Sequence, residues 1–137
     1  MKKYLSMIAF VMMAMMAFTL QSCGDDDNDS LYKIETTMHF DDEGDVLTHE
    51  QCEALVMEVA KKGKSNSVYY PSDDAAAEAT KFVANALKQE LVALNQEFGT
   101  AMFTITIKCI KVKDNKQVIT YYVTYDDHDW EVSDNKN

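Results

Sequence analysis

The sequence is poor in glycine, proline and basic residues, and these shortages remove several classes of function. Its 137 residues include four glycines and one proline. It has no glycine-rich phosphate loop and no glycine-framed nucleophilic serine. Only 13 Lys and Arg residues stand against 23 Asp and Glu, which gives a net charge of -10. Because nucleic-acid binding depends on neutralising phosphates with basic side chains, this balance argues against nucleic acid as a partner.

Histidine is also scarce, so metal binding and acid–base catalysis would depend on His39, His49 and His128. His39 and His49 flank an acidic turn that begins at Asp41, and His128 lies in a second acidic segment. If the last strand ended beside the first, these segments could bind a divalent ion through imidazole and carboxylate groups. The spacing matches neither a zinc signature nor an EF-hand. Solvated loops are therefore the favoured interpretation, and His39, Asp41 and His128 are weak metal candidates.

One long apolar run is present, at the N-terminus. Lys2 and Lys3 precede residues 4–20, which are apolar and rich in Met and Ala, and polar residues follow. This pattern is typical of a secretory signal peptide, and the run is slightly short for a transmembrane helix.

The motif LQSC at residues 20–23 resembles the lipobox of bacterial lipoproteins, with Gln21 as a less usual middle residue. The resemblance implies that residues 1–22 are removed as a signal peptide and that Cys23 carries a lipid anchor such as palmitate. Residues 23–30 are rich in aspartate and are expected to form an extended tether. This segment is similar to the acidic export segment of Bacteroidota surface lipoproteins, which implies the cell surface of the outer membrane. A periplasm-facing lipoprotein is the alternative.

Two cysteines, Cys52 and Cys109, remain in the mature chain and would meet an oxidising compartment. A disulfide between them would close a loop of nearly sixty residues. Loop-closure entropy for that length corresponds to about 4 kcal/mol of stabilisation. The alternative is two buried free thiols that pack as small apolar groups. A catalytic role for Cys52 beside His49 is disfavoured because Cys52 lies on the apolar stripe of a predicted helix.

Alternating apolar residues predict three strands, over residues 31–40, 101–113 and 117–125. The alternation changes phase near Cys109, as a β-bulge would allow. A loop at residues 114–116 would join the last two strands as a hairpin.

Capping residues predict two helices. Thr48 and Gln51 form a capping box that opens a helix ending near residue 62. Ser72 is the expected N-cap of a second, Ala-rich helix that continues to about residue 98 and ends at Gly99.

The order strand, helix, helix, strand, strand predicts an α+β fold. Burying the apolar faces of these elements requires a two-layer sandwich, with a small, mainly antiparallel sheet packed on two helices. The domain is expected to span residues 31–130, with a polar tail at residues 131–137. In this arrangement Cys109 faces the helical layer that carries Cys52, which favours the disulfide.

Four aromatic residues are candidates for a binding surface: Tyr69, Tyr70, Tyr122 and Trp130. Exposed Tyr and Trp side chains often contribute to binding surfaces, although partial burial within the fold is the alternative.

The sequence as a whole favours a lipid-anchored envelope protein with a non-catalytic module that binds a protein, peptide or glycan, and no cofactor. An open sheet face or an exposed strand edge could serve as the binding surface. Two alternatives remain open. One is a small metal-dependent or hydrolytic enzyme that uses His39, His49 or His128 with acidic neighbours, and the other is a structural envelope subunit that assembles by strand exchange.

Overall fold

A computed structural model of the chain describes residues 31–64, 67–93 and 95–135. The strands are β1 (Leu31–Asp42), β2 (Val68–Tyr69), β3 (Met102–Lys111), β4 (Lys116–Asp126) and β5 (Asp129–Asp134). The helices are α2 (His49–Lys62), α3 (Asp73–Val92) and α4 (Asn95–Phe98). The predicted signal peptide, Cys23 and the acidic tether lie outside the described residues. Among the described helices, none has the length and apolar character needed to cross a membrane.

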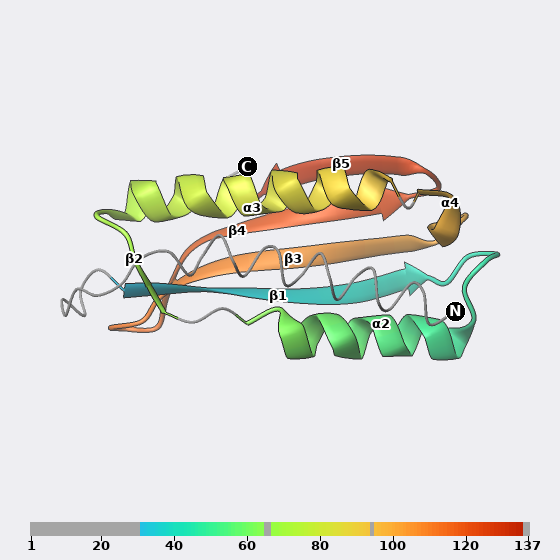
Figure 1. The fold of residues 1–137 in the computed structure, drawn as a ribbon, viewed down its shortest axis with the longest axis horizontal. Coiled ribbons are helices and arrows are strands. Elements are labelled where there is room, and N and C mark those ends of the chain that lie inside the picture. Colours follow the sequence, from blue (N-terminus) through green and yellow to red (C-terminus); the bar gives the residue numbers. More distant parts are fainter. Residues whose placement is uncertain (1–30, 65–66, 94, 136–137) are drawn as a thin grey trace.

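The strands form one antiparallel sheet in the order β2-β1-β3-β4-β5. Helix α2 packs on β1, and α3 packs on β3, β4 and β5. The buried residues of both helices join those of a single sheet face in one core. Helix α2 runs along the β1 edge of the sheet and α3 runs along the β4–β5 edge (Figure 1). This arrangement confirms the α+β class.

Two strands of the sheet were not predicted, so the expected order of elements was wrong. Strand β2 has only two residues, which is too short for an alternating pattern to be visible. Strand β5 begins at the end of the predicted domain and continues through residues 131–134, which were predicted to belong to a polar tail. It returns along β4 through Asp127 and His128, which have φ angles of 48° and 77°. Tight hairpins need such positive φ values and usually signal them with Asn-Gly or Asp-Gly, which this sequence lacks here.

The change of phase predicted near Cys109, in the strand at residues 101–113, is confirmed as a β-bulge. Cys109 pairs with Ile119, whereas the next residue, Ile110, pairs with Gln117, so Val118 is the extra residue on β4. The bulge lets Ile110, which is buried, follow directly after the buried Cys109.

Both predicted helix starts are confirmed, but the second helix is shorter than expected. Thr48 and Gln51 form a reciprocal capping box at α2, and the Ser72 hydroxyl accepts from the backbone of α3. Helix α3 ends at Val92, and the separate turn α4 carries the chain toward β3. This change of direction allows Phe98 to pack against Phe103, with 5.1 Å between ring centroids.

Gly63 closes the contact between the end of α2 and the outer edge of β1. The Thr36 amide donates to the Gly63 carbonyl oxygen at 2.7 Å. A Cβ atom at Gly63 would lie 2.4 Å from the Thr36 carbonyl oxygen and 2.5 Å from that of Val59. Both are backbone atoms, so relief would require moving the end of α2 away from β1 and also distorting the last turn of α2, to which Val59 belongs.

Replacing Gly63 by alanine is therefore expected to lower the free energy of unfolding by about 1–3 kcal/mol, the usual range for overpacking. Urea denaturation followed by circular dichroism would measure it. Lys61→Ala, at an exposed position of the same helix end, is the control and should change stability by less than about 0.5 kcal/mol. Equal stability of the two variants would contradict the close approach of α2 and β1.

Candidate functional site

The sheet face opposite the helices carries polar side chains in cross-strand rows. The central row joins Thr37, Thr106, Tyr122 and Ser133, each directly opposite the next across the strands. A neighbouring row joins His39, Thr104, Thr124 and Glu131. Because side chains of paired residues in neighbouring strands project from the same face, the polar side chains of the two rows are neighbours on that face. We call these two rows the open face.

The four aromatic candidates divide between the two sides of the sheet. Tyr122 is partly exposed on the open face, and Tyr69, opposite Leu31, projects on the same side at the sheet margin. Tyr70 packs on the helical side, with its ring centroid 5.9 Å from that of Tyr32. Trp130 also faces the core, where its ring contacts those of Phe103 and Tyr125. The structure thus places only Tyr122 within the open face.

Trp130 belongs to an aromatic cluster at the α4 end of the core. Its ring centroid lies 4.7 Å from Tyr125 and 5.8 Å from Phe103. The Tyr125 hydroxyl donates to the Gly99 carbonyl oxygen at 2.5 Å, which ties β4 to the loop after α4. Trp130 therefore has a packing role in this fold.

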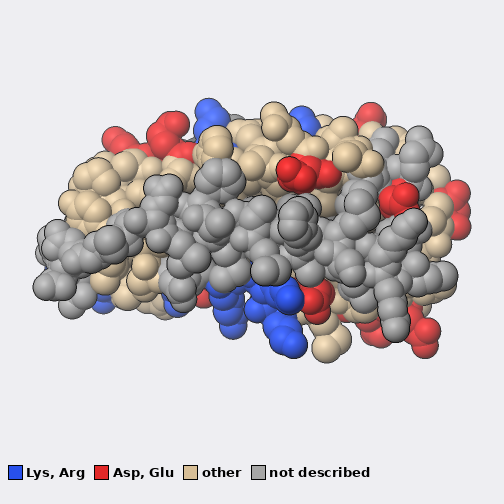
Figure 2. Space-filling model, viewed as in Figure 1, with Lys and Arg blue, Asp and Glu red and all other residues tan. Residues whose placement is uncertain are grey.

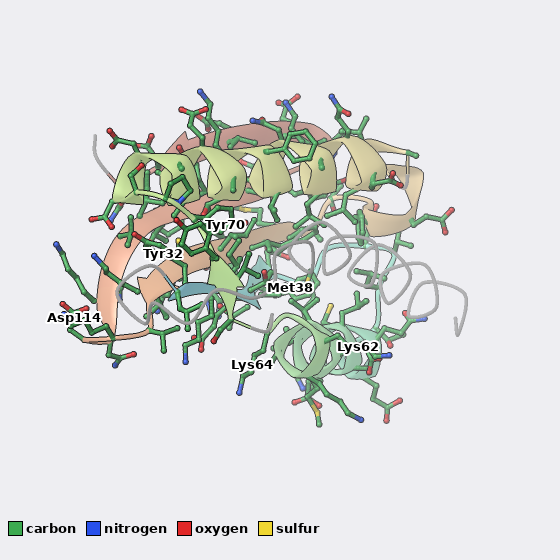
Figure 3. The ribbon with its side chains drawn as sticks, turned by 60° about the vertical axis from the view of Figure 1, so that its left-hand side comes forward. Tyr32, Met38, Lys62, Lys64, Tyr70 and Asp114 are labelled. Atoms are coloured by element: carbon green, nitrogen blue, oxygen red, sulfur yellow. The ribbon has the colours of Figure 1, made fainter. Side chains whose placement is uncertain are left out.

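A second cluster, at the other end of the sheet, connects β1, β3 and α3. The Tyr32 hydroxyl donates to Asp73 Oδ1 at 2.6 Å, and Lys111 Nζ lies 3.6 Å from the same oxygen. Figure 3 shows Tyr32 and Tyr70 together below α3. The hydrogen bond from Tyr32 lowers the pKa of Asp73, and burial together with the Asp73 carboxylate raises the pKa of Tyr32.

The carboxylates of the acidic turn between β1 and α2 are engaged in local contacts. Asp42 Oδ1 accepts from the Gly44 amide at 2.8 Å, and Asp45 Oδ1 accepts from the Thr100 amide at 3.0 Å. The hydrogen bonds from Thr100 lower the pKa of Asp45. The turn is thus fixed against the start of β3.

His49 links this turn to α2. Its Nδ1 lies 2.5 Å from Glu43 Oε2 and its Nε2 lies 3.3 Å from Glu53 Oε2. The contact with Glu43, and to a smaller degree the charge of Glu53, raises the pKa of His49. A raised pKa means that the folded state favours the protonated imidazole. This contribution to stability is fully present below the unfolded pKa of about 6.5 and is lost as the pH rises through the folded pKa.

A titration of His49 by NMR is expected to give a pKa above the ordinary histidine value, and Glu43→Gln is expected to lower it. Urea denaturation should show the matching trend, with the stability difference between wild type and Glu43→Gln shrinking as the pH rises from about 6 to 8. Asp114→Asn, a change of the same charge in the β3–β4 turn, is the control. An unchanged His49 pKa in Glu43→Gln would contradict the link.

The structure brings His39 and Asp41 together, but it does not bring His128 to them. His39 Nε2 lies 3.4 Å from Asp41, and His128 Nε2 lies 3.8 Å from Asp127. His39 is on β1 and His128 follows β4, so β3 lies between their strands and the usual strand spacing separates them by about 10 Å. Within the described ranges, no three His, Cys, Asp or Glu side chains are grouped so as to hold a metal ion.

The predicted disulfide is absent: Cys52 and Cys109 are both free and buried. Cys52 lies beside Phe40, which pairs with Phe103, six residues before Cys109 on β3. Six residues of strand span about 20 Å, whereas bonded cysteines need Cα atoms within about 7 Å. The two thiols point into the same core but at different levels along the sheet.

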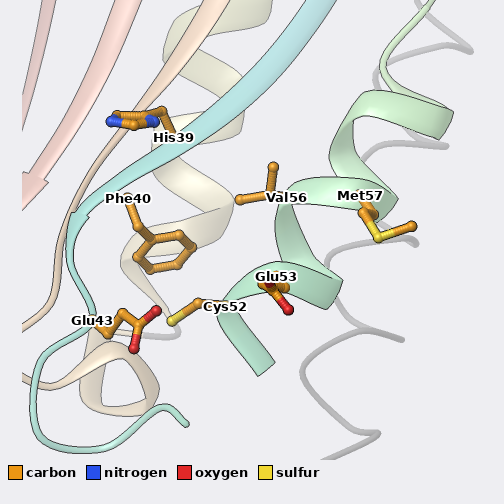
Figure 4. Close-up of a pocket in the computed structure, with 7 residues that line it drawn as sticks. All are labelled: His39, Phe40, Glu43, Cys52, Glu53, Val56 and Met57. Atoms are coloured by element: carbon orange, nitrogen blue, oxygen red, sulfur yellow. The ribbon is translucent and has the colours of Figure 1, made fainter. Parts of the chain in front are cut away.

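Cys52 also lines a pocket between β1 and α2 with a volume of about 400 Å³. Its lining residues are His39, Phe40, Glu43, Cys52, Glu53, Val56 and Met57. Figure 4 shows Phe40 and Cys52 facing each other, with Val56 on the helix beside them. Burial and the nearby Glu43 carboxylate raise the pKa of Cys52 to about 11, so the thiol is neutral at physiological pH and poorly suited to nucleophilic attack.

This pocket was not predicted from the sequence. The only signal was Met57, an apolar residue on the solvent side of α2 that is 71% exposed. A single exposed methionine is common on protein surfaces and does not reveal which strand lies opposite it.

Comparison of the chain with protein-family models, with curated proteins and with solved structures finds no match.

Proposed function

We propose that this chain is a lipid-anchored protein of the bacterial outer membrane, exposed at the cell surface, whose folded domain binds a ligand without catalysis. The anchor rests on the lipobox resemblance at residues 20–23 and the acidic segment that follows. A location facing the periplasm is the alternative. The described domain begins at Leu31, directly after that segment.

The observation that carries the binding proposal is the open face. Both long helices pack on the other side of the sheet, so no described helix covers the central hydroxyl row with Tyr122. The ring of Tyr122 offers an apolar stacking surface with a polar tip. The threonine hydroxyls around it can both donate and accept hydrogen bonds. This combination suits a glycan, whose sugar rings have apolar C–H faces and hydroxyl edges.

The enzyme alternative has weaker support. The imidazoles of His39, His49 and His128 each pair with a carboxylate close in sequence, and their strands hold His39 and His128 apart. Assembly by strand exchange would involve the sheet edges and would appear as a stable oligomer in solution.

Lipidation is tested by expressing the full-length chain and Cys23→Ala in a bacterium that processes lipoproteins. We expect the wild type in the outer-membrane fraction, with a lipid-modified N-terminal cysteine in its mass spectrum, and loss of both properties in Cys23→Ala. Ser22→Ala keeps a small residue before the cysteine and is the control. An unmodified Cys23 in the wild type would disprove the anchor.

Glycan binding is tested with the detergent-solubilised protein on an array of bacterial and host polysaccharides, followed by calorimetry. Tyr122→Ala is expected to weaken binding at least tenfold, because loss of one stacked aromatic anchor costs about 1.4 kcal/mol or more. Phe82→Ala, on the exposed side of α3, should bind as wild type does. An array without signal, or equal binding by Tyr122→Ala and wild type, would refute the glycan proposal.

A further inference from the structure

The outer edge of β1 offers a second binding site, distinct from the open face. We propose that residues 37–42 of β1 bind a short, extended, basic segment of a partner protein by strand addition. An apolar side chain of that segment would enter the pocket between β1 and α2. The proposal does not depend on glycan binding and uses different residues.

The first support is the unpaired backbone of β1. On one side, β1 pairs with β3 along nearly its whole length. On the other, the pairing within the described residues is limited to β2 at residues 31–32 and a single bridge between Glu35 and Lys64. The Thr36 amide points to this outer side, where it bonds Gly63.

The backbone N–H and C=O groups of the residues after Thr36 have directions that follow from the regular alternation of an extended strand. In an antiparallel strand, the N–H and C=O groups of every second residue point to the same side. Those of Met38 and Phe40 therefore also point outward, where no strand of the described chain pairs with them. Such an edge is a ready template for one more strand.

The second support is the position of the pocket beside this free backbone. Phe40 contributes the strand side of the pocket, and Val56 and Met57 contribute the helix side. A ligand strand bonded to Met38 and Phe40 would direct alternate side chains to one face of the sheet, and one of them would lie over the pocket. Main-chain hydrogen bonds would then supply affinity, and the pocket would select an apolar side chain.

The third support is charge, which selects the kind of segment. Glu43 and Glu53 line the pocket, and the strand ends at Asp41 and Asp42. These four carboxylates outnumber the two imidazoles that pair with them, those of His39 and His49. The basic residues Lys61 and Lys62 lie in the last turn of α2, away from the acidic residues near its start. In Figure 2 basic side chains gather below the middle of the molecule and acidic ones toward the right, where Figure 1 shows α2 beginning.

This polarity favours a basic partner over a second copy of the chain. A segment with lysine or arginine beside an apolar residue would be attracted to the acidic side chains around the pocket. This electrostatic attraction would raise its rate of association. A second copy carries the same net charge of -10 and is repelled at long range. The bridge at Lys64 further limits the free edge to a few residues, so the ligand segment is short.

The test uses the detergent-solubilised, lipidated protein labelled with ¹⁵N and a short capped peptide of alternating Lys and Val. We expect NMR shifts at residues 38–42 and on the α2 residues of the pocket, and slower hydrogen exchange of the Met38 and Phe40 amides. N-methylation of the peptide backbone keeps its charges and side chains but removes its donors, and should weaken binding at least tenfold. A peptide of alternating Glu and Val should not bind.

Met57→Lys places a positive charge at the pocket and should weaken the Lys-Val peptide at least tenfold. Val92→Lys makes the same charge change on α3, where Val92 is 43% exposed, and should not alter binding. Equal binding of the parent and N-methylated peptides would overturn the proposal, because charge alone would then explain the affinity. Shifts confined to Tyr122 and its row would also overturn it. Tyr122→Ala should retain peptide binding, which separates this outcome from that of the glycan test.

Discussion

Replacing Phe103 by alanine is expected to lower the free energy of unfolding by about 3–5 kcal/mol, the range for a buried large-to-small change of an aromatic residue. Phe103 has no exposed surface, and its ring centroid lies 5.1 Å from each of Phe40, Phe98 and Tyr125. The substitution would therefore leave a cavity among these three rings and that of Trp130, whose centroid lies 5.8 Å away. Because small domains have about 5–15 kcal/mol of stability in total, the variant should be close to unfolding.

Urea denaturation followed by circular dichroism and tryptophan fluorescence would measure the loss, since Trp130 lies in the same cluster. Phe82→Ala is the matched control, because Phe82 is 55% exposed on α3. We expect its effect to stay below about 1 kcal/mol. A loss of less than about 1 kcal/mol in Phe103→Ala would show that the cluster is not packed as described.

Alkaline pH is expected to unfold the domain cooperatively. Burial is the largest cause of a raised pKa at Tyr32, Tyr70, Tyr121, Tyr125, Cys52 and Cys109. A group with a raised folded pKa keeps its proton at a pH where the unfolded chain has lost it. The stability from these groups is therefore complete below the unfolded values, about 8.5 for cysteine and 10 for tyrosine. It is lost as the pH rises through the folded values, such as about 11 for Cys52.

The measurement is the urea midpoint between about pH 7 and 11, with tyrosinate absorbance recorded on the same samples. We expect the midpoint to fall steeply above about pH 9, and the buried tyrosines to ionise together with unfolding. Tyr32→Phe removes one of these groups and should flatten the alkaline decline, although the lost hydrogen bond to Asp73 lowers its stability at neutral pH. A midpoint that stays constant up to about pH 11 would contradict the burial of these side chains.

The sequence predicted what depends on local patterns. Alternation located β1, β3 and β4, and the capping residues Thr48 and Ser72 located the starts of α2 and α3. The bulge after Cys109 was visible because it shifts the apolar period by one residue. These features depend on neighbours within a few residues, so a single sequence contains them.

The two errors at the candidate site, the disulfide and the pocket, concern position along the sheet, which alternation does not encode. A period of two predicts which face of β3 carries Cys109, but it does not say which level of the strand lies beneath Cys52. The prediction that Cys52 and Cys109 both face the core was correct, but the predicted disulfide was wrong because the two thiols lie at different positions along the sheet. The pocket was missed for the same reason, since it depends on how α2 is placed along β1.

The pairing of β1 also has a mechanical consequence for a chain anchored at Cys23. Strand β1 starts at Leu31, so a pull on the anchor would act along the strand axis. The hydrogen bonds between β1 and β3 run perpendicular to that axis and cover residues 32–42. They would be loaded together in shear and would have to break together, whereas a hairpin pulled from its open end breaks one bond at a time. If the chain stands at the cell surface as proposed, flow would pull on the domain through this strand. Its resistance would then be set by the rate at which β1 and β3 separate.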